Sequence, residues 1–189
     1  MKKNIFILLA AIVMAGVVNA QEGGFGRSVR LSFGYINAKS VMVHPEIAHG
    51  VDLAINSTPA INIDAELWRV GQHTGLGLYA NFCPLFEEGR ANVSYDLGAG
   101  LRYHVLSAAG VVSSKWDVTL NANVGVAGSV VSPLNVHLGY NAGVTATFYP
   151  FKRFGIFVEA SAGRMDMFRG HYGLYTISTM LKTGISYRF

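Results

Sequence analysis

Residues 91–105 read ANVSYDLGAGLRYHV, and two kinds of side chain alternate along this stretch without a break. Every second residue from Val93 to Val105 is apolar or aromatic, whereas the residues between them are polar, charged or glycine. A period of two is the pattern of a β-strand whose two faces meet different surroundings. The stretch is also longer than the roughly five or six residues of a usual globular strand. It therefore predicts a long strand with one apolar face.

The same alternation recurs along the rest of the chain. WDVTLNANVGVAG at 116–128 and VHLGYNAGVTATFYP at 136–150 repeat it clearly. Five further candidate strands are 28–37, 60–70, 74–84, 153–164 and 174–189. The sequence thus predicts eight strands, several of which match the ~9–11 residues that cross a lipid bilayer at a tilt. No helical periodicity is expected after residue 20, and no internal domain boundary is visible.

The composition fits a membrane protein that lacks membrane-spanning helices. The chain is 51% hydrophobic and 14% charged and contains 22 glycines. After residue 20, however, no apolar stretch approaches the ~20 residues of a transmembrane helix. In lipid, only helix bundles and closed β-barrels satisfy every backbone polar group. Apolar-out, polar-in alternation with an even strand number predicts an all-β, eight-stranded, antiparallel up-and-down transmembrane barrel. A soluble barrel of lipocalin type is the alternative, but it would carry its apolar face inside.

The first 20 residues, MKKNIFILLAAIVMAGVVNA, have the pattern of a secretory signal peptide. Lys2 and Lys3 precede an apolar run, and Ala20 ends a small-residue cleavage pattern. We therefore expect a signal peptide at 1–20 and one barrel domain at 21–189, with a membrane-anchoring helix as the alternative for the first segment. The net charge of +4 is too small for a nucleic-acid partner. Cys83 is the only cysteine, which excludes an intrachain disulfide and a cysteine-based metal cluster.

Charged residues fall on the face predicted to line the barrel. In a narrow barrel they must be paired, because an unpaired buried charge is costly. Glu159 and Lys182, on adjacent strands at a similar depth, are the best candidate pair, and His104 is expected to pair with Asp117 across a hairpin. The predicted interior charge network comprises Arg30, Asp64, Glu66, Asp96, Arg102, Glu159, Lys182 and Arg188.

The chain ends in KTGISYRF, with apolar or aromatic residues at every second position from Ile185 to Phe189. Lys182, Gly184, Tyr187 and Phe189 match the polar-x-Gly-x-x-aromatic-x-aromatic ending of outer-membrane β-barrel proteins. With the eight alternating strands, the chain resembles the small outer-membrane barrels of the OmpX, OmpW and OmpA-transmembrane type. The resemblance implies that this ending is read by the barrel assembly machinery. It also implies residence in the bacterial outer membrane, in contact with membrane lipid and lipopolysaccharide.

The predicted connections alternate in character. The segments 70–75, 106–115 and 149–154 are expected to be periplasmic turns, which leaves both chain ends in the periplasm. The segments 38–59, 84–90, 128–135 and 164–174 are expected to face outside. The two longer ones, 38–59 and 164–174, mix apolar and polar residues and are the predicted place for an extracellular partner, because binding residues concentrate on loops held by a rigid scaffold. The candidate surface-binding residues are Val41, Met42, His44, Met167, Phe168 and Tyr172.

These observations favour a non-enzymatic barrel, monomeric and without cofactor or metal, that serves envelope integrity, adhesion or partner binding. A narrow channel for small solutes and a lipid A-modifying enzyme are the alternatives. Some outer-membrane barrels that deacylate lipid A use a His-x-Ser pair, but here glycine follows in the sequence His137-Leu138-Gly139, so the nucleophile is missing. His44, Glu46 and His49 form a possible metal-ligand set in the long loop, although loop residues alone fix no geometry.

Overall fold

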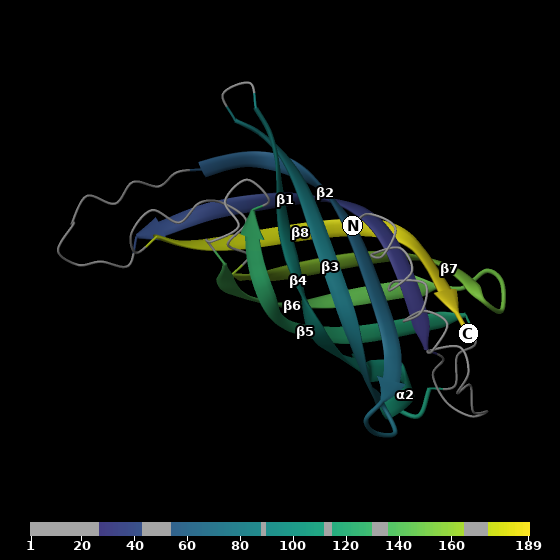
Figure 1. The fold of residues 1–189 in the computed structure, drawn as a ribbon. Helices are drawn as coiled ribbons and strands as arrows, with labels where there is room; N and C mark the ends of the chain where they lie inside the picture. Colours follow the sequence, from purple (N-terminus) through teal and green to yellow (C-terminus); the bar gives the residue numbers. More distant parts are fainter. Residues whose placement is uncertain (1–26, 43–53, 88–89, 112–114, 130–135, 165–173) are drawn as a thin grey trace, which may run out of the picture.

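The computed structural model describes residues 27–42, 54–87, 90–111, 115–129, 136–164 and 174–189. Eight antiparallel strands form a closed barrel in which each strand pairs with its neighbours in the chain and β1 pairs with β8 (Figure 1). The predicted fold class is therefore confirmed. Within the described residues, no helix is long and apolar enough to cross a membrane. The expected signal peptide at 1–20 lies outside the described residues.

The strands follow the predicted order, and their bounds differ mainly where they leave the predicted membrane region. The elements are β1 Ser28–Met42, β2 Ala54–Arg69, β3 Thr74–Glu87, β4 Arg90–His104, α2 Val105–Ala108, β5 Trp116–Ser129, β6 His137–Phe148, β7 Phe154–Arg164 and β8 Leu174–Arg188.

The alternation in sequence sorts side chains between the two faces of the barrel wall. On β4, Leu97 and Leu101 are exposed on the outside, whereas Asp96 and Arg102 are almost fully buried inside. This distribution is the reverse of that in a soluble protein, where large apolar side chains are mostly buried. The exterior therefore matches lipid and the interior is polar, as in a transmembrane barrel.

Glycine pairs allow close contact between neighbouring strands on the inner face. Gly98 of β4 lies opposite Gly125 of β5. A Cβ atom added to Gly98 would overlap the carbonyl oxygen of Val124, and one added to Gly125 would overlap that of Leu97. Eight strands leave an interior only wide enough for packed side chains, so small residues have to alternate with large ones.

A β-bulge interrupts the alternation near the end of β2. The register with β3 shifts between Glu66 and Trp68. As a result Leu67 is buried, with 1% of its surface exposed, while Trp68 is 50% exposed on the outside. Unbroken alternation from Glu66 would have placed Trp68 inside. Bulges are frequent at the rims of barrels, where they re-aim a side chain.

One end of the barrel, the turn end, contains the short connections at 70–73, 105–115 and 149–153. The amide of Phe189 donates a hydrogen bond of 3.0 Å to the carbonyl of Arg27, so the end of β8 and the start of β1 also lie there. The sequence predicts no helix in this region, whereas Val105–Ala108 forms one short helical turn, α2. Four residues are too few to show helical periodicity.

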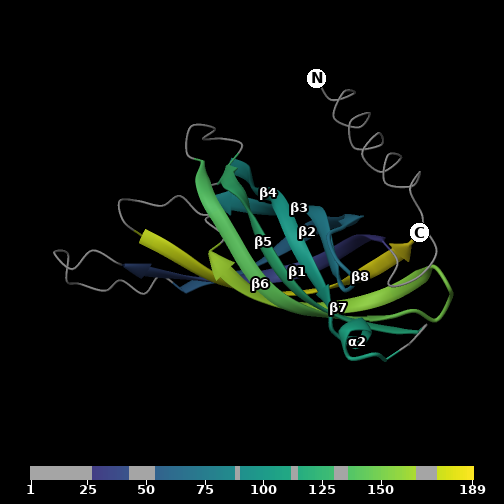
Figure 2. The ribbon, with the colours of Figure 1, turned by 90° about the horizontal axis from the view of Figure 1, so that it is seen from below.

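At the opposite end, the loop end, several strands are longer than predicted. Residues 38–42 and 54–59, expected to be loop, belong to β1 and β2, and β1 pairs with β8 as far as Met42 and Leu174. Likewise, residues 84–87 belong to β3. Figure 2 shows β1 and β8 continuing together toward the loop end. The expected long loops therefore reduce to 43–53 and 165–173, which lie outside the described residues.

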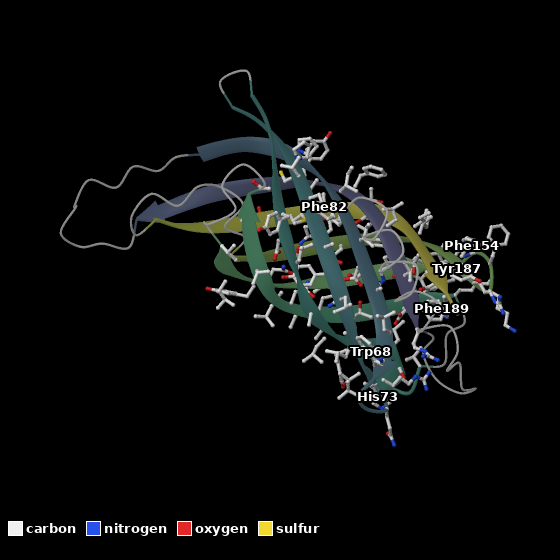
Figure 3. All side chains as sticks on the ribbon, viewed as in Figure 1. Trp68, His73, Phe82, Phe154, Tyr187 and Phe189 are labelled. Atoms are coloured by element: carbon white, nitrogen blue, oxygen red, sulfur yellow. The ribbon has the colours of Figure 1, made fainter. Side chains whose placement is uncertain are left out.

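Aromatic side chains on the outer surface cluster near the turn end. Trp68, Tyr103, Trp116 and Phe154 are exposed, and each is the first, last or next-to-last residue of its strand. The Phe154 and Tyr187 rings lie 4.9 Å apart, and those of Trp116 and Phe148 4.8 Å apart. Figure 3 shows Trp68, Phe154, Tyr187 and Phe189 toward this end and Phe82 farther from it. We call this group the turn-end girdle, because aromatic girdles mark the membrane–water interfaces of outer-membrane barrels.

Candidate functional site: the polar interior

The most organised polar feature of the described structure is the interior of the barrel. Every strand contributes side chains to it, and most of them are buried. The charged members that are nearly inaccessible are Arg30, Glu66, Asp96, Arg102, His104, Asp117, Glu159 and Lys182. Asp64 is slightly more accessible, with 15% of its side chain exposed, and Arg188 is half-buried. The structure thus places all eight residues of the predicted charge network on the inner face.

Glu159 and Lys182 form an ion pair in the wall between β7 and β8. Lys182 Nζ lies 2.7 Å from Glu159 Oε1, and the two residues are direct partners in the strand register. Thr145 Oγ1 donates a hydrogen bond of 2.9 Å to Glu159 Oε2, and Asn121 Nδ2 donates one of 2.5 Å to Thr145 Oγ1. The carboxylate is therefore held on both oxygens. This is the pair that sequence analysis singled out.

Arg102 connects residues on strands that are not neighbours. Its guanidinium forms an ion pair with Asp64, so β4 is joined to β2 across the intervening β3. In the other direction, Arg102 Nη1 donates a hydrogen bond of 2.7 Å to Asn123 Oδ1, and Asn123 Nδ2 donates one of 2.7 Å to Asn141 Oδ1. A continuous polar chain therefore runs from β2 to β6 through the lumen.

His104 lies between two carboxylates near the turn end. Its Nδ1 is 3.0 Å from Asp117, and its Nε2 is 3.1 Å from Glu66. The imidazolium form donates one hydrogen bond to each carboxylate. His104 and Glu66 each expose only 1% of their side chains. A histidine shielded this well has no access to a substrate, so its geometry fits a structural junction between β2, β4 and β5 better than a catalytic dyad.

Closer to the loop end, Asp96 is bound by neutral donors. Tyr79 Oη donates a hydrogen bond of 2.8 Å to one oxygen of Asp96, and Asn81 Nδ2 donates one of 3.2 Å to the other. Cys83, also on β3, is fully buried, with its Sγ 3.4 Å from the carbonyl oxygen of Pro59. A thiol without solvent access is unreactive.

Two arginines near the turn end contact aromatic rings inside the barrel. The Arg188 guanidinium carbon lies 3.7 Å from the centre of the Tyr149 ring, and that of Arg30 lies 5.7 Å from the centre of the Phe157 ring. Tyr149 is anchored in turn by a hydrogen bond of 3.0 Å between its hydroxyl and that of Ser186. Cation–π contacts of this kind strengthen when water is excluded.

Comparison with known proteins adds evidence on the fold. No protein-family model and no curated protein matches this chain. Among solved structures, it is similar to the crystal structure of Neisserial surface protein A, at 13% identity over 89% of this chain and 100% of that chain, with a TM-score of 0.58. The chain has the fold of the small outer-membrane β-barrels.

Two other solved outer-membrane barrels match with lower scores. One is Ail, the attachment invasion locus protein of Yersinia pestis, at 11% identity over 86% of this chain and 99% of that chain, with a TM-score of 0.46. The other is the outer-membrane enzyme PagL, at 14% identity over 79% of this chain and 97% of that chain, with a TM-score of 0.36. One is an attachment protein by name and the other an enzyme. At these identities neither likeness assigns a role to this chain.

In this barrel, the residues predicted for partner binding are only partly described. Val41 and Met42 belong to β1, not to a loop, and their backbones pair with Tyr175 and Leu174 of β8. This corrects the loop assignment. The remaining candidates are outside the described residues: His44, Met167, Phe168 and Tyr172. The possible metal ligands His44, Glu46 and His49 are also outside them, and in the described part of the chain no group of His, Cys, Asp or Glu side chains suits a metal ion.

The predicted assembly signal lies at the end of β8, with Phe189 directly after the strand. Lys182 faces the lumen, and Tyr187 belongs to the turn-end girdle, with Phe189 6.4 Å away between ring centres. Gly184 lies against β1, where an added Cβ would overlap the carbonyl oxygen of Leu31. The neutral bridging residues Tyr79, Asn123, Asn141 and Thr145 were absent from the predicted charge network. In the sequence they occupy the same inward-facing positions of the alternation as the charged residues. A search restricted to charged residues does not find them.

Proposed function

We propose that this protein is a non-enzymatic outer-membrane barrel whose closed body anchors binding segments above the membrane. The observation that carries the proposal is the blocked lumen. The ion pair between Arg102 and Asp64 spans β4 to β2, and the contact between His104 and Glu66 spans the same strands nearer the turn end. An eight-stranded barrel has no room for an aqueous channel beside such side chains.

The uneven height of the wall supports the display role. At about 3.3 Å per residue and a tilt of about 40°, a strand of 15 residues such as β1 rises about 38 Å along the barrel axis. The 11 residues of β7 rise only about 28 Å. The strand β1 and its partner β8 are therefore roughly 10 Å taller than β7. They are also taller than the apolar band of such barrels, which measures about 25 Å. The segment 43–53 follows β1, and the segment 165–173 precedes β8.

The partner would be an extracellular molecule, and the candidates for holding it are Val41, Met42, His44, Met167, Phe168 and Tyr172. The barrel itself would be monomeric and surrounded by outer-membrane lipid and lipopolysaccharide. The signal peptide at 1–20 would direct export, and the C-terminal motif would deliver the chain to the barrel assembly machinery.

The interior also supports a non-enzymatic role. Glu159, the inward carboxylate that a lipid A deacylase would need, is occupied by Lys182 and Thr145. Gly139 stands where such an enzyme has its serine, and it faces the lumen. Expression of the protein should therefore leave the mass spectrum of lipid A unchanged. A loss or gain of acyl chains would favour the enzyme instead.

Conductance measurements distinguish the proposed closed barrel, which anchors binding segments, from a narrow channel for small solutes. Purified protein in a planar bilayer should give no steady current, because side chains from strands that are not neighbours meet across its lumen. A reproducible open state in the wild type would overturn the anchor and favour a narrow channel.

The display role is tested separately by protease treatment of intact cells. Cleavage within 43–53 or 165–173, with the turn at 149–153 protected, is expected, and the reverse pattern would contradict the proposed orientation.

A further inference from the structure

The described side chains at the turn end carry exposed positive charge. Arg69, Lys115, Lys152 and Arg153 are exposed, and they lie in or directly beside the three turns. Arg27 is half-buried at the same end, where its guanidinium donates a hydrogen bond to the carbonyl of Leu67. The described residues of these turns, 69–74, 105–111, 115 and 149–153, include no Asp or Glu. We call these five cationic residues the basic collar.

Among the described residues, the two acidic side chains closest to this end do not lie on its outer rim. Glu66 and Asp117 are buried in the lumen, where both contact His104. The described side chains on the outer rim at this end therefore carry net positive charge.

The collar coincides with the turn-end girdle. Each of its four exposed members is adjacent in sequence to an exposed aromatic residue: the pairs are Trp68–Arg69, Lys115–Trp116, Phe151–Lys152 and Arg153–Phe154. Arg153 Nη1 also donates a hydrogen bond of 3.4 Å to Tyr187 Oη (Figure 3 shows Tyr187 and Phe154 together). Interfacial aromatic rings lie at the level of lipid headgroups. The cations next to them therefore lie at the level of the headgroup phosphates.

We propose that the basic collar binds the phosphates of anionic phospholipids in the leaflet at the turn end. Lysine and arginine both bind phosphate, arginine through its planar fork and lysine as a point charge. A soluble acidic polymer is the other partner that positive charge suits, but it would be met by cations projecting away from the membrane, not by cations interleaved with a girdle. The inference is independent of whether the lumen conducts and of what the loop end binds.

The chain contains a built-in reporter for this site. Trp68 and Trp116 are its only two tryptophans, and they adjoin Arg69 and Lys115. We would refold the full protein into vesicles of equal phosphatidylglycerol and phosphatidylcholine content, with bromine on the acyl chains of one lipid or the other. Because bromine quenches nearby tryptophan, the two quenching curves give the relative occupancy of the two lipids. We expect a preference for phosphatidylglycerol of roughly fivefold, the effect of one basic residue at an anionic surface.

A charge-removing variant and a charge-conserving variant provide the matched comparison. Arg69→Gln with Lys115→Gln should bring the preference close to one, whereas Arg69→Lys with Lys115→Arg should retain it. High salt should weaken the preference of the wild type. A change in electrophoretic mobility upon heating verifies that each variant is folded. Equal quenching by both lipids in the wild type would overturn the proposal and leave a soluble acidic polymer as the partner. A preference that persists in the glutamine variant would overturn it as well.

Discussion

At the scale of single residues, the Glu159–Lys182 pair shows why a buried charge has to keep its partner. Changing Glu159→Gln or Lys182→Met leaves the other charge unpaired in the wall of the lumen. Each single change is expected to lower the free energy of unfolding by about 3–5 kcal/mol. The double variant should be much closer to the wild type, because no uncompensated charge remains.

Urea unfolding from lipid vesicles, followed by tryptophan fluorescence, measures these differences as a double-mutant cycle. The signal is suitable because both tryptophans lie at the turn end, away from the pair on β7 and β8. If the two single changes simply add in the double variant, the groups act independently and the ion pair is not the stabilising contact.

At the scale of elements, the close contact between β4 and β5 depends on glycines, which have no side chain. Gly98→Val places two methyl groups where Gly98 meets the backbone of Val124. We expect a loss of about 1–3 kcal/mol in unfolding free energy, the usual cost of overpacking. Ala99→Val, one position away on the outer face, is the matched control and should change stability little. Equal losses in both variants would show that the inner contact is not special.

A change at the end of β8 allows the folding of the chain and its delivery to the outer membrane to be tested separately. Phe189→Ala removes one ring beside Tyr187 and leaves the strand register intact. If the ending is read during assembly, the amount of protein in the outer membrane of cells should fall severalfold. Spontaneous refolding of the purified variant into vesicles should be nearly unchanged. A comparable defect in both assays would mean that Phe189 acts through stability alone.

At the scale of the whole molecule, closure joins the first strand to the last. The β1–β8 pairing brings together residues about as far apart as the chain allows, from Ser28–Arg188 to Met42–Leu174. A closed sheet has no free edge at which it could begin to unravel. The protein should therefore remain folded in detergent without heating and change its electrophoretic mobility on boiling. A single mobility at all temperatures would contradict a stable closed barrel.

The sequence predicted most of this architecture because lipid and lumen impose opposite demands on the two faces of each strand. Asp96 and Leu97 differ in burial because they are neighbours in a strict alternation. Prediction was wrong where that constraint ends. Residues 38–42 read AKSVM and do not continue the alternation of apolar and polar residues, so no pattern marks them as strand. The bulge at Leu67 was missed because a shift of register depends on the pairing with β3.

The candidate site was predictable as a set of inward charges and less so as a network. The Glu159–Lys182 contact follows from two adjacent strands, whereas the link from Arg102 to Asp64 passes over an intervening strand and depends on the diameter of the barrel. The basic collar was not recognised in the sequence, because its members are scattered among three turns and gather only when the barrel closes.

The hydrogen bond between Phe189 and Arg27 has a consequence for how the chain could be rearranged. It brings the described start and end of the barrel together, so a short linker there would join them, and new ends opened at another turn would preserve every strand pairing. Such a circular permutant would keep the same closed ring while a different strand became the last one. The ring has no preferred first strand, and only the order in which the chain is made and delivered singles out β8.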